Sequence, residues 1–168
     1  MNNTVLLNIG RFILFAFLQI VLFNHINILG FATPYPYILF ILLFPINTNK
    51  KILLIVSFLM GLLLDVFNDS GGVHAAACLS LAYLRDTFLK ISYGVSYEYH
   101  MIKITERFST ELITYVLLSV VLHHIVFYSL EIFSFDFVLE ILLKTLTSSI
   151  VTAVFVFIFI ALLKPNKS

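Results

Sequence analysis

Charged residues are scarce in this 168-residue chain: they make up 11% of it, against about 25% in an average soluble domain. Hydrophobic residues make up 61%. A soluble domain of this length could not bury so many apolar side chains, because its surface is too large relative to its core. The net charge of +1 also argues against a nucleic-acid-binding surface. The composition therefore predicts a protein folded in a lipid bilayer.

Tryptophan is absent and cysteine occurs once, at Cys78. A single cysteine excludes an internal disulfide framework. Without tryptophan, the eight tyrosines must supply most of any aromatic belt at the membrane surface. Internal repeats and low-complexity tracts are absent too. We therefore expect one transmembrane helical domain over residues 1–168.

Apolar runs approach the roughly 20 residues that a membrane-spanning helix needs. The candidates are residues 5–23, 37–46, 52–67, 73–89, 112–130 and 137–163. The second run is short and lies between prolines, while Arg85 and Asp86 interrupt the fourth. The remaining question is which of these runs cross the membrane.

The basic residues favour six crossings. Lys and Arg are absent from residues 24–36, 68–73 and 131–139. With six crossings every basic residue except Lys144 falls on one side, which the positive-inside rule assigns to the cytoplasm. Lys144 is explained by a pair with Glu140, four residues earlier on the same helix. The prediction is an all-α polytopic membrane protein with a short second helix and both termini cytoplasmic; five helices would lose this agreement.

Residues 60–86 carry polar side chains within an apolar run. Asp65 lies about 20 Å into a helix that begins at Ile52, in the outer third of the membrane. The segment that ends at Gly72 has the composition of a turn, and His74 opens the next helix. Gly61 shares a face with Asp65, and small residues let membrane helices approach closely. We expect a tight outer hairpin that brings Asp65 near His74.

Three roles are open for Asp65 and His74. They form a structural pair or cap, a contact site for a partner, or a site of proton transfer or metal binding. The local spacing lacks the dense ligand pattern of a metal site. The sequence therefore predicts no metal and no cofactor.

Two adjacent histidines, His123 and His124, lie in the outer half of the fifth span. A zinc or pH-sensing cluster is conceivable because histidine titrates near neutral pH. Neighbouring helical residues point about 100° apart, however, so the two cannot easily face one ligand. Polar contacts between helices, or placement at the membrane interface, are favoured instead. Ser148, Ser149 and Thr152 form a small polar face on the last helix, suited to helix packing. No nucleophile elbow, phosphate-binding loop or zinc-protease motif occurs, so we expect a protein that is not an enzyme.

The predicted cytoplasmic segment 85–111 has the periodicity of an amphipathic helix. Its basic residues and tyrosines suit anchoring at the inner leaflet, where Lys and Arg meet anionic lipid. Docking of another protein is the alternative.

Several of these features together resemble the MreD family, integral membrane proteins of the bacterial rod-shape system. The residues that carry the resemblance are Thr33-Pro34-Tyr35-Pro36-Tyr37 with Pro45, Gly61-Leu62-Leu63-Leu64-Asp65, Gly72-Val73-His74-Ala75 and Ala82-Tyr83-Leu84-Arg85. The chain departs from the family at Tyr37, where family members often have an acidic or amide residue.

The resemblance implies a scaffold of the cell-elongation machinery in the bacterial cytoplasmic membrane. It implies binding to an MreC-like single-pass protein, and through it to MreB-like actin and a peptidoglycan synthase pair. The implied fold is like that of the substrate-binding subunits of energy-coupling-factor vitamin transporters. The alternative function is a small-molecule-binding membrane subunit of that kind, with a pocket built from Asp65, His74, His123 and His124. A proton-coupled transporter is disfavoured because no carboxylate is expected at the midplane.

Overall fold

The structure, a computed structural model, describes residues 2–28, 30, 32–94 and 108–163. Over these residues the chain is helical. The elements are α1 (Asn2–Val21), η1 (Phe23–His25), α2 (Ile38–Leu42), α3 (Lys50–Asn68), α4 (Val73–Tyr93), α6 (Thr110–Ile132), η2 (Phe135–Phe137) and α7 (Val138–Leu163).

Four stretches within the described residues form helices long and apolar enough to cross a membrane. They are Thr4–His25, Lys50–Asn68, Thr110–Ile132 and Phe135–Leu163. Helix α4 is of similar length but carries Arg85 and Asp86. The prediction of a helical membrane protein is confirmed.

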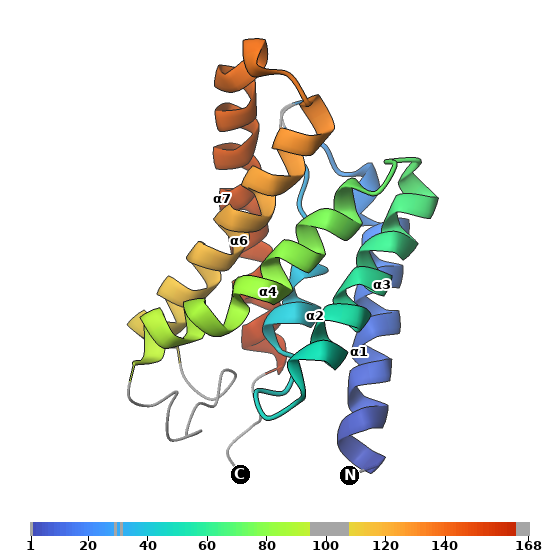
Figure 1. The fold of residues 1–168 in the computed structure, drawn as a ribbon, viewed down its shortest axis with the longest axis vertical. Helices are drawn as coiled ribbons and strands as arrows, with labels where there is room; N and C mark the ends of the chain where they lie inside the picture. The colour runs from blue at the N-terminus through green and yellow to red at the C-terminus, as the bar shows by residue number, and fades with distance from the viewer. Residues whose placement is uncertain (1, 29, 31, 95–107, 164–168) are drawn as a thin grey trace.

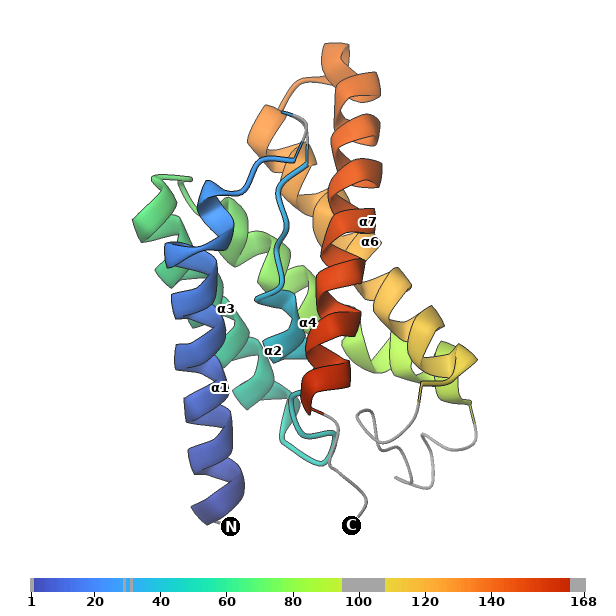
Figure 2. The same cartoon turned by 180° about the vertical axis from the view of Figure 1, so that it is seen from behind.

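The helices run between two ends of the molecule, which we call the terminal end and the hairpin end. Figure 1 shows the N- and C-terminal ends of the chain together at its lower side, the terminal end. The α3–α4 turn and the α6–α7 connection lie at the opposite side, the hairpin end. Helices α1 and α3 therefore run in the same direction, and α4 returns against α3 (Figures 1 and 2).

The predicted second helix is helical only over α2, and the chain that leads into it is extended. The extended backbone has a local cause, because Pro34 and Pro36 lack the amide hydrogens that a helix would use. Figure 2 shows this segment passing inside the ring of long helices, beside α6 and α7. Residues 37–42 are almost completely inaccessible to solvent. Non-helical backbone at membrane depth is tolerated only where protein surrounds it, as here.

Side chains from α1 and α7 bond to the backbone of this extended segment. The amide of Thr33 donates to Ser148 Oγ (3.3 Å), and the amide of Tyr35 donates to Thr152 Oγ1 (3.0 Å). The carbonyl of Pro34 accepts from Gln19 Nε2 (3.2 Å). The polar face predicted on the last helix thus supplies partners for backbone groups that have no helical ones.

The other end of α2 is bonded by Arg85. Its guanidinium donates to the carbonyl oxygens of Leu42 and Phe44, and its Nε donates to the hydroxyl of Tyr115 (3.2 Å). The expectation that Arg85 belongs to a cytoplasmic surface segment is wrong, because the residue is 1% exposed within α4. A buried arginine is retained here because its fork of donors matches the free carbonyls at the end of a five-residue helix.

Helix α4 continues past Arg85 and Asp86, which interrupt the apolar run in the sequence, as far as Tyr93. It ends at Gly94, which has φ of 49°. Residues 85–93 of the predicted amphipathic segment therefore belong to a packed helix. Residues 95–107 of the segment lie outside the described residues, and its last two residues, Thr110 and Glu111, begin α6. On α7, the predicted pair of Lys144 with Glu140 is confirmed, with 3.0 Å between Nζ and Oε1.

Gly61 sets the distance between α3 and α4. A Cβ at this position would lie 2.5 Å from the Cα of Ala75 and 2.5 Å from the carbonyl oxygen of His74. Both neighbours are backbone atoms, which cannot rotate away. The close approach that small residues permit between membrane helices therefore depends on this glycine.

We expect Gly61→Ala to destabilise the protein by about 1–3 kcal/mol, because the added methyl group forces α3 away from α4. Thermal unfolding in detergent measures the effect. Gly10→Ala is the matched control, since an added Cβ there meets nothing within 4 Å. Equal melting temperatures for the two variants would contradict this account of the helix contact.

Candidate functional site

Polar side chains converge in the half of the molecule nearest the hairpin end. Asp65 lies on α3, His74 on α4, and both His123 and His124 on α6. All four side chains are buried. Tyr37 enters the same region from the start of α2 and is completely buried.

Asp65 caps the first turn of α4 from the neighbouring helix. One carboxylate oxygen accepts from the amide of His74 (2.9 Å), and the other accepts from the amide of Ala75 (2.9 Å). The residue in the N-cap position is Gly72, which has φ of 99° and no side chain to serve as a cap. A carboxylate at a helix N-terminus is further favoured by the helix dipole.

The expected proximity of Asp65 and His74 is therefore present, but the bond is made with the backbone amide of His74. The imidazole of His74 points to a different partner, the hydroxyl of Tyr37. Nδ1 of His74 lies 2.9 Å from this hydroxyl, and Nε2 of His123 lies 2.8 Å from it. One tyrosine thus joins histidines from α4 and α6.

The direction of the hydrogen bonds follows from Asn68. Its amide Nδ2 lies 3.4 Å from Nε2 of His74, so that this nitrogen accepts. Nδ1 of His74 then carries the hydrogen and donates to Tyr37, whose hydroxyl donates to Nε2 of His123. Both histidines are neutral in this scheme, because each uses one ring nitrogen as an acceptor.

His124 takes part in a separate set of contacts. Its Nδ1 lies 2.7 Å from the carbonyl oxygen of Val120, and its Nε2 lies 3.2 Å from Oγ1 of Thr152. His123 and His124 thus have different hydrogen-bond partners, α2 for the first and α7 for the second. The two do not form a joint ligand set.

The ring of Tyr35 fills the space between the histidines. Its centroid lies 5.6 Å from that of His74, 6.3 Å from that of His123 and 5.5 Å from that of His124. Because the Tyr35 ring occupies this place, the faces of the three imidazoles contact protein atoms. Within the described part of the chain, no group of three His, Cys, Asp or Glu side chains is arranged to hold a metal.

The residues named from the sequence therefore fall into three groups. Gly61, Asp65, Gly72 and His74 build the α3–α4 hairpin, and His123 joins it through Tyr37. His124 contacts α7 instead, and Arg85 bonds the opposite end of α2, away from the histidines.

Sequence reasoning missed Tyr37, whose hydroxyl is the centre of the network. A signal was present, since a tyrosine directly follows two prolines in an apolar run, where its backbone cannot continue a helix toward the N-terminus. The position also coincides with the one where MreD proteins often have a polar residue.

Comparison with known proteins assigns no family: no family model, no curated protein and no solved structure matches the chain. The resemblance to MreD therefore rests on the residues quoted above.

We expect Asp65→Ala to destabilise the protein by about 1–3 kcal/mol, because two buried amides lose their acceptor. Asp65→Asn keeps one acceptor oxygen and should lie between Asp65→Ala and the wild type. Unfolding by added denaturing detergent measures the order of the three proteins. An order in which Asp65→Asn is no better than Asp65→Ala would contradict the cap.

Removal of the Tyr37 hydroxyl leaves two buried imidazoles without their shared partner. Tyr37→Phe should therefore lower the free energy of unfolding by about 1–3 kcal/mol. Tyr83→Phe is the control, because Tyr83 is exposed on the neighbouring α4 and its ring remains available to Lys50. Indistinguishable melting curves for the two variants would show that the network adds no stability.

Proposed function

We propose that this protein is an MreD-like scaffold subunit of the bacterial cell-elongation machinery. It sits in the cytoplasmic membrane, crosses it six times with both termini in the cytoplasm, and binds the spanning helix of an MreC-like single-pass partner. MreB-like actin and the peptidoglycan synthase pair are reached through that partner. The protein itself carries out no catalysis.

One observation carries the choice of a scaffold over the small-molecule-binding alternative. The pocket of the alternative needs convergent polar groups that are open to a ligand. Asp65, His74, His123 and His124 are buried, and they bond to backbone amides and carbonyls, to Tyr37 and to Thr152. Nδ1 of His123 has no hydrogen-bond partner, but it is buried within the protein. The other groups are already bonded, hold the helices in place and are not available to a substrate.

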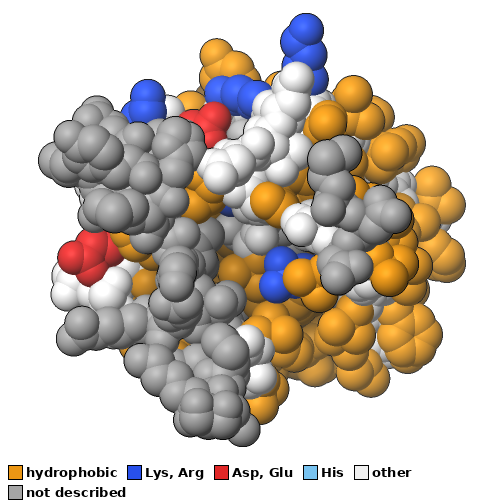
Figure 3. All heavy atoms as spheres, turned by 90° about the horizontal axis from the view of Figure 1, so that it is seen from below, with side chains coloured by type: hydrophobic (Ala, Val, Ile, Leu, Met, Phe, Trp, Pro, Cys, Tyr) orange, Lys and Arg blue, Asp and Glu red, His pale blue; other side chains and the backbone are white. Residues whose placement is uncertain are grey.

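The distribution of charge supports the proposed orientation. Lys50 and Lys51 begin α3 and Lys90 lies in the last turn of α4, so all three are at the terminal end. Figure 3 views this end and shows Lys and Arg side chains beside a broad hydrophobic surface. The positive-inside rule assigns such an end to the cytoplasm.

The face of α3 near the hairpin end is the surface that we assign to the partner. Leu59, Leu62 and Val66 are exposed and follow each other at the three- and four-residue spacing of a helix-packing stripe. The same stretch of α3 is held rigidly by the Gly61 contact and the Asp65 cap. A rigid, preorganised surface loses less entropy on binding than a mobile one.

Co-purification with an MreC-like single-pass protein in mild detergent tests the proposal. The wild type should co-elute with the partner, and Val66→Trp should weaken or abolish co-elution because the larger side chain separates the packed helices. Leu139→Trp is the matched control, since Leu139 is 71% exposed at the hairpin end of α7 and Val66 is 74% exposed. Asp65 is a poorer probe, because its side chain is buried in the cap.

Elution of the wild type without the partner would contradict the scaffold. A small molecule retained in that fraction would turn the assignment toward the vitamin-transporter type of subunit. Equal loss of co-elution in Val66→Trp and Leu139→Trp would agree with a scaffold but would contradict the assignment of the α3 face to the partner.

A further inference from the structure

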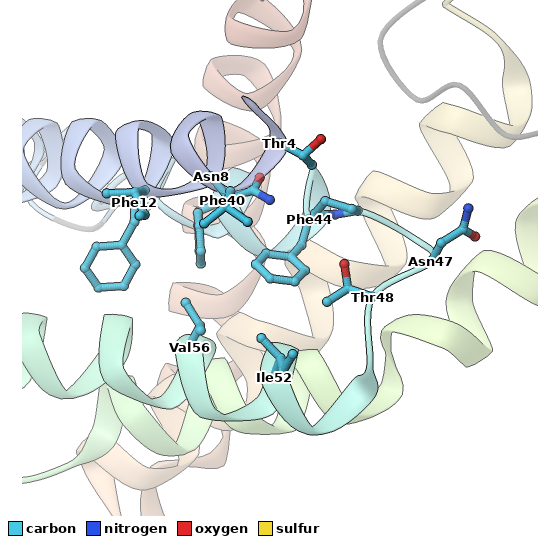
Figure 4. Close-up of a pocket in the computed structure, with 12 residues that line it drawn as sticks. Thr4, Asn8, Phe12, Phe40, Phe44, Asn47, Thr48, Ile52 and Val56 are labelled. Carbon is cyan, nitrogen blue, oxygen red and sulfur yellow. The ribbon is translucent and has the colours of Figure 1, made fainter. Parts of the chain in front are cut away.

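A groove of about 620 Å³ lies between α1 and α3, with α2 as its floor. Figure 4 shows Phe12 of α1 facing Val56 of α3 across it, with Phe40 of α2 and Phe44, which follows α2, between the two helices. Helix α1 stands on the outside of the bundle, with most of its apolar side chains exposed. The groove belongs neither to the polar network nor to the α3 face assigned to the partner.

Beyond the groove, toward the hairpin end, a side-chain bond connects the segment after α1 with the end of α3. Asn24, which follows α1, donates from its Nδ2 to Oδ1 of Asn68 at the end of α3, over 2.7 Å. This bond joins the two helices there. The groove residues all belong to the parts of α1, α2 and α3 on the side of the terminal end, from Thr4 to Phe12 and from Phe40 to Val56.

Polarity changes along the groove. The deep part is lined by Phe12, Phe40 and Val56, whereas Asn47 and Thr48 lie at the terminal end (Figure 4). An occupant must therefore be apolar along most of its length and polar at one end. That end must sit at the level of the membrane surface.

The polar mouth is suited to negative charge. Because α1 and α3 run in the same direction, the N-terminal ends of both helices lie at this end of the groove (Figure 1). Helix N-termini carry partial positive charge and favour phosphate groups. The side chains of Asn47 and Thr48 add hydrogen-bond donors at this mouth.

The shape of the groove disfavours a protein helix. Membrane helices pack on small residues that let backbones approach, and the base of this groove is formed by phenylalanines. A methylene group occupies about the volume of a water molecule, roughly 30 Å³, so the groove holds on the order of 20 of them. That is the size of one acyl chain.

We propose that the groove is a binding site for one phospholipid from the leaflet at the terminal end. One acyl chain lies along Phe12, Phe40 and Val56. The phosphate group lies at the mouth, where Asn47 and Thr48 offer hydrogen-bond donors and the N-terminal ends of α1 and α3 offer partial positive charge.

The test is a titration of the full-length, delipidated protein in detergent with a phosphatidylglycerol that carries one palmitoyl and one oleoyl chain. Native mass spectrometry counts the bound lipids, and thermal unfolding measures the stabilisation that binding produces. The wild type should bind one lipid and melt at a higher temperature. Diacylglycerol with the same chains should bind more weakly, and inorganic phosphate should give no shift in melting temperature, because each lacks one part of the ligand.

Val56→Trp narrows the groove and should weaken binding about tenfold, because exclusion of about two methylene groups already removes that much affinity. Ile55→Trp is the matched control: Ile55 is the preceding residue, is 60% exposed and does not line the groove. It should bind as the wild type does. If Val56→Trp does not fold, Ile52→Trp at the mouth takes its place.

Equal binding by Val56→Trp and the wild type would overturn the proposal, as would the absence of a bound lipid in the wild type. Loss of the single-pass partner in Val56→Trp without any lipid binding would also overturn it, since the groove would then be a protein interface. The scaffold function is tested separately on the face that contains Val66, so the two proposals can fail independently.

Discussion

The need to bond the backbone of residues 33–44 inside an apolar protein shapes most of this structure. An unpaired amide or carbonyl in such surroundings costs several kcal/mol, and a five-residue helix pairs few of its own groups. Side chains of the surrounding helices supply the missing hydrogen bonds. They are Ser148 and Thr152 from α7, Gln19 from α1 and Arg85 from α4. These four polar residues on otherwise hydrophobic helices are therefore explained by the backbone of residues 33–44.

Hydrogen bonds between Tyr37 and two histidines connect the same segment to the rest of the bundle. Tyr37 stands where the extended segment becomes α2, and its hydroxyl joins α4 and α6 through His74 and His123. With Asp65 occupied by the first turn of α4, the half of the protein near the hairpin end has a closed polar interior. The accessible surfaces of this half are apolar helix faces, and the groove beside α1 lies on the side of the terminal end. A closed polar interior with apolar outer faces agrees better with the proposed scaffold than with a carrier of substrates.

The long helices were predicted well from the sequence, because each residue of an apolar run indicates apolar surroundings at its own position. The turn at residues 68–72 and the pair of Glu140 with Lys144 were also predictable, since both depend on neighbours in sequence. Arg85 and Tyr37 were misjudged for the opposite reason. Their partners lie far away along the chain, and only the folded bundle brings Arg85 to Phe44 or Tyr37 to His123. A charge inside an apolar run looks the same whether it faces water or caps a buried helix.

The alternation Thr33-Pro34-Tyr35-Pro36 has a consequence for the order of assembly. Two residues of extended chain advance about 6.6 Å, and four residues of helix rise about 6 Å, so the amides of Thr33 and Tyr35 match Ser148 and Thr152 in spacing. A slip of α7 by one residue along its axis would lose both bonds. Because synthesis proceeds from the N-terminus, these two amides acquire their acceptors only after the last helix has been made. The hydrogen bonds of Thr33 and Tyr35 to Ser148 and Thr152 therefore form only when α7 packs against the extended segment.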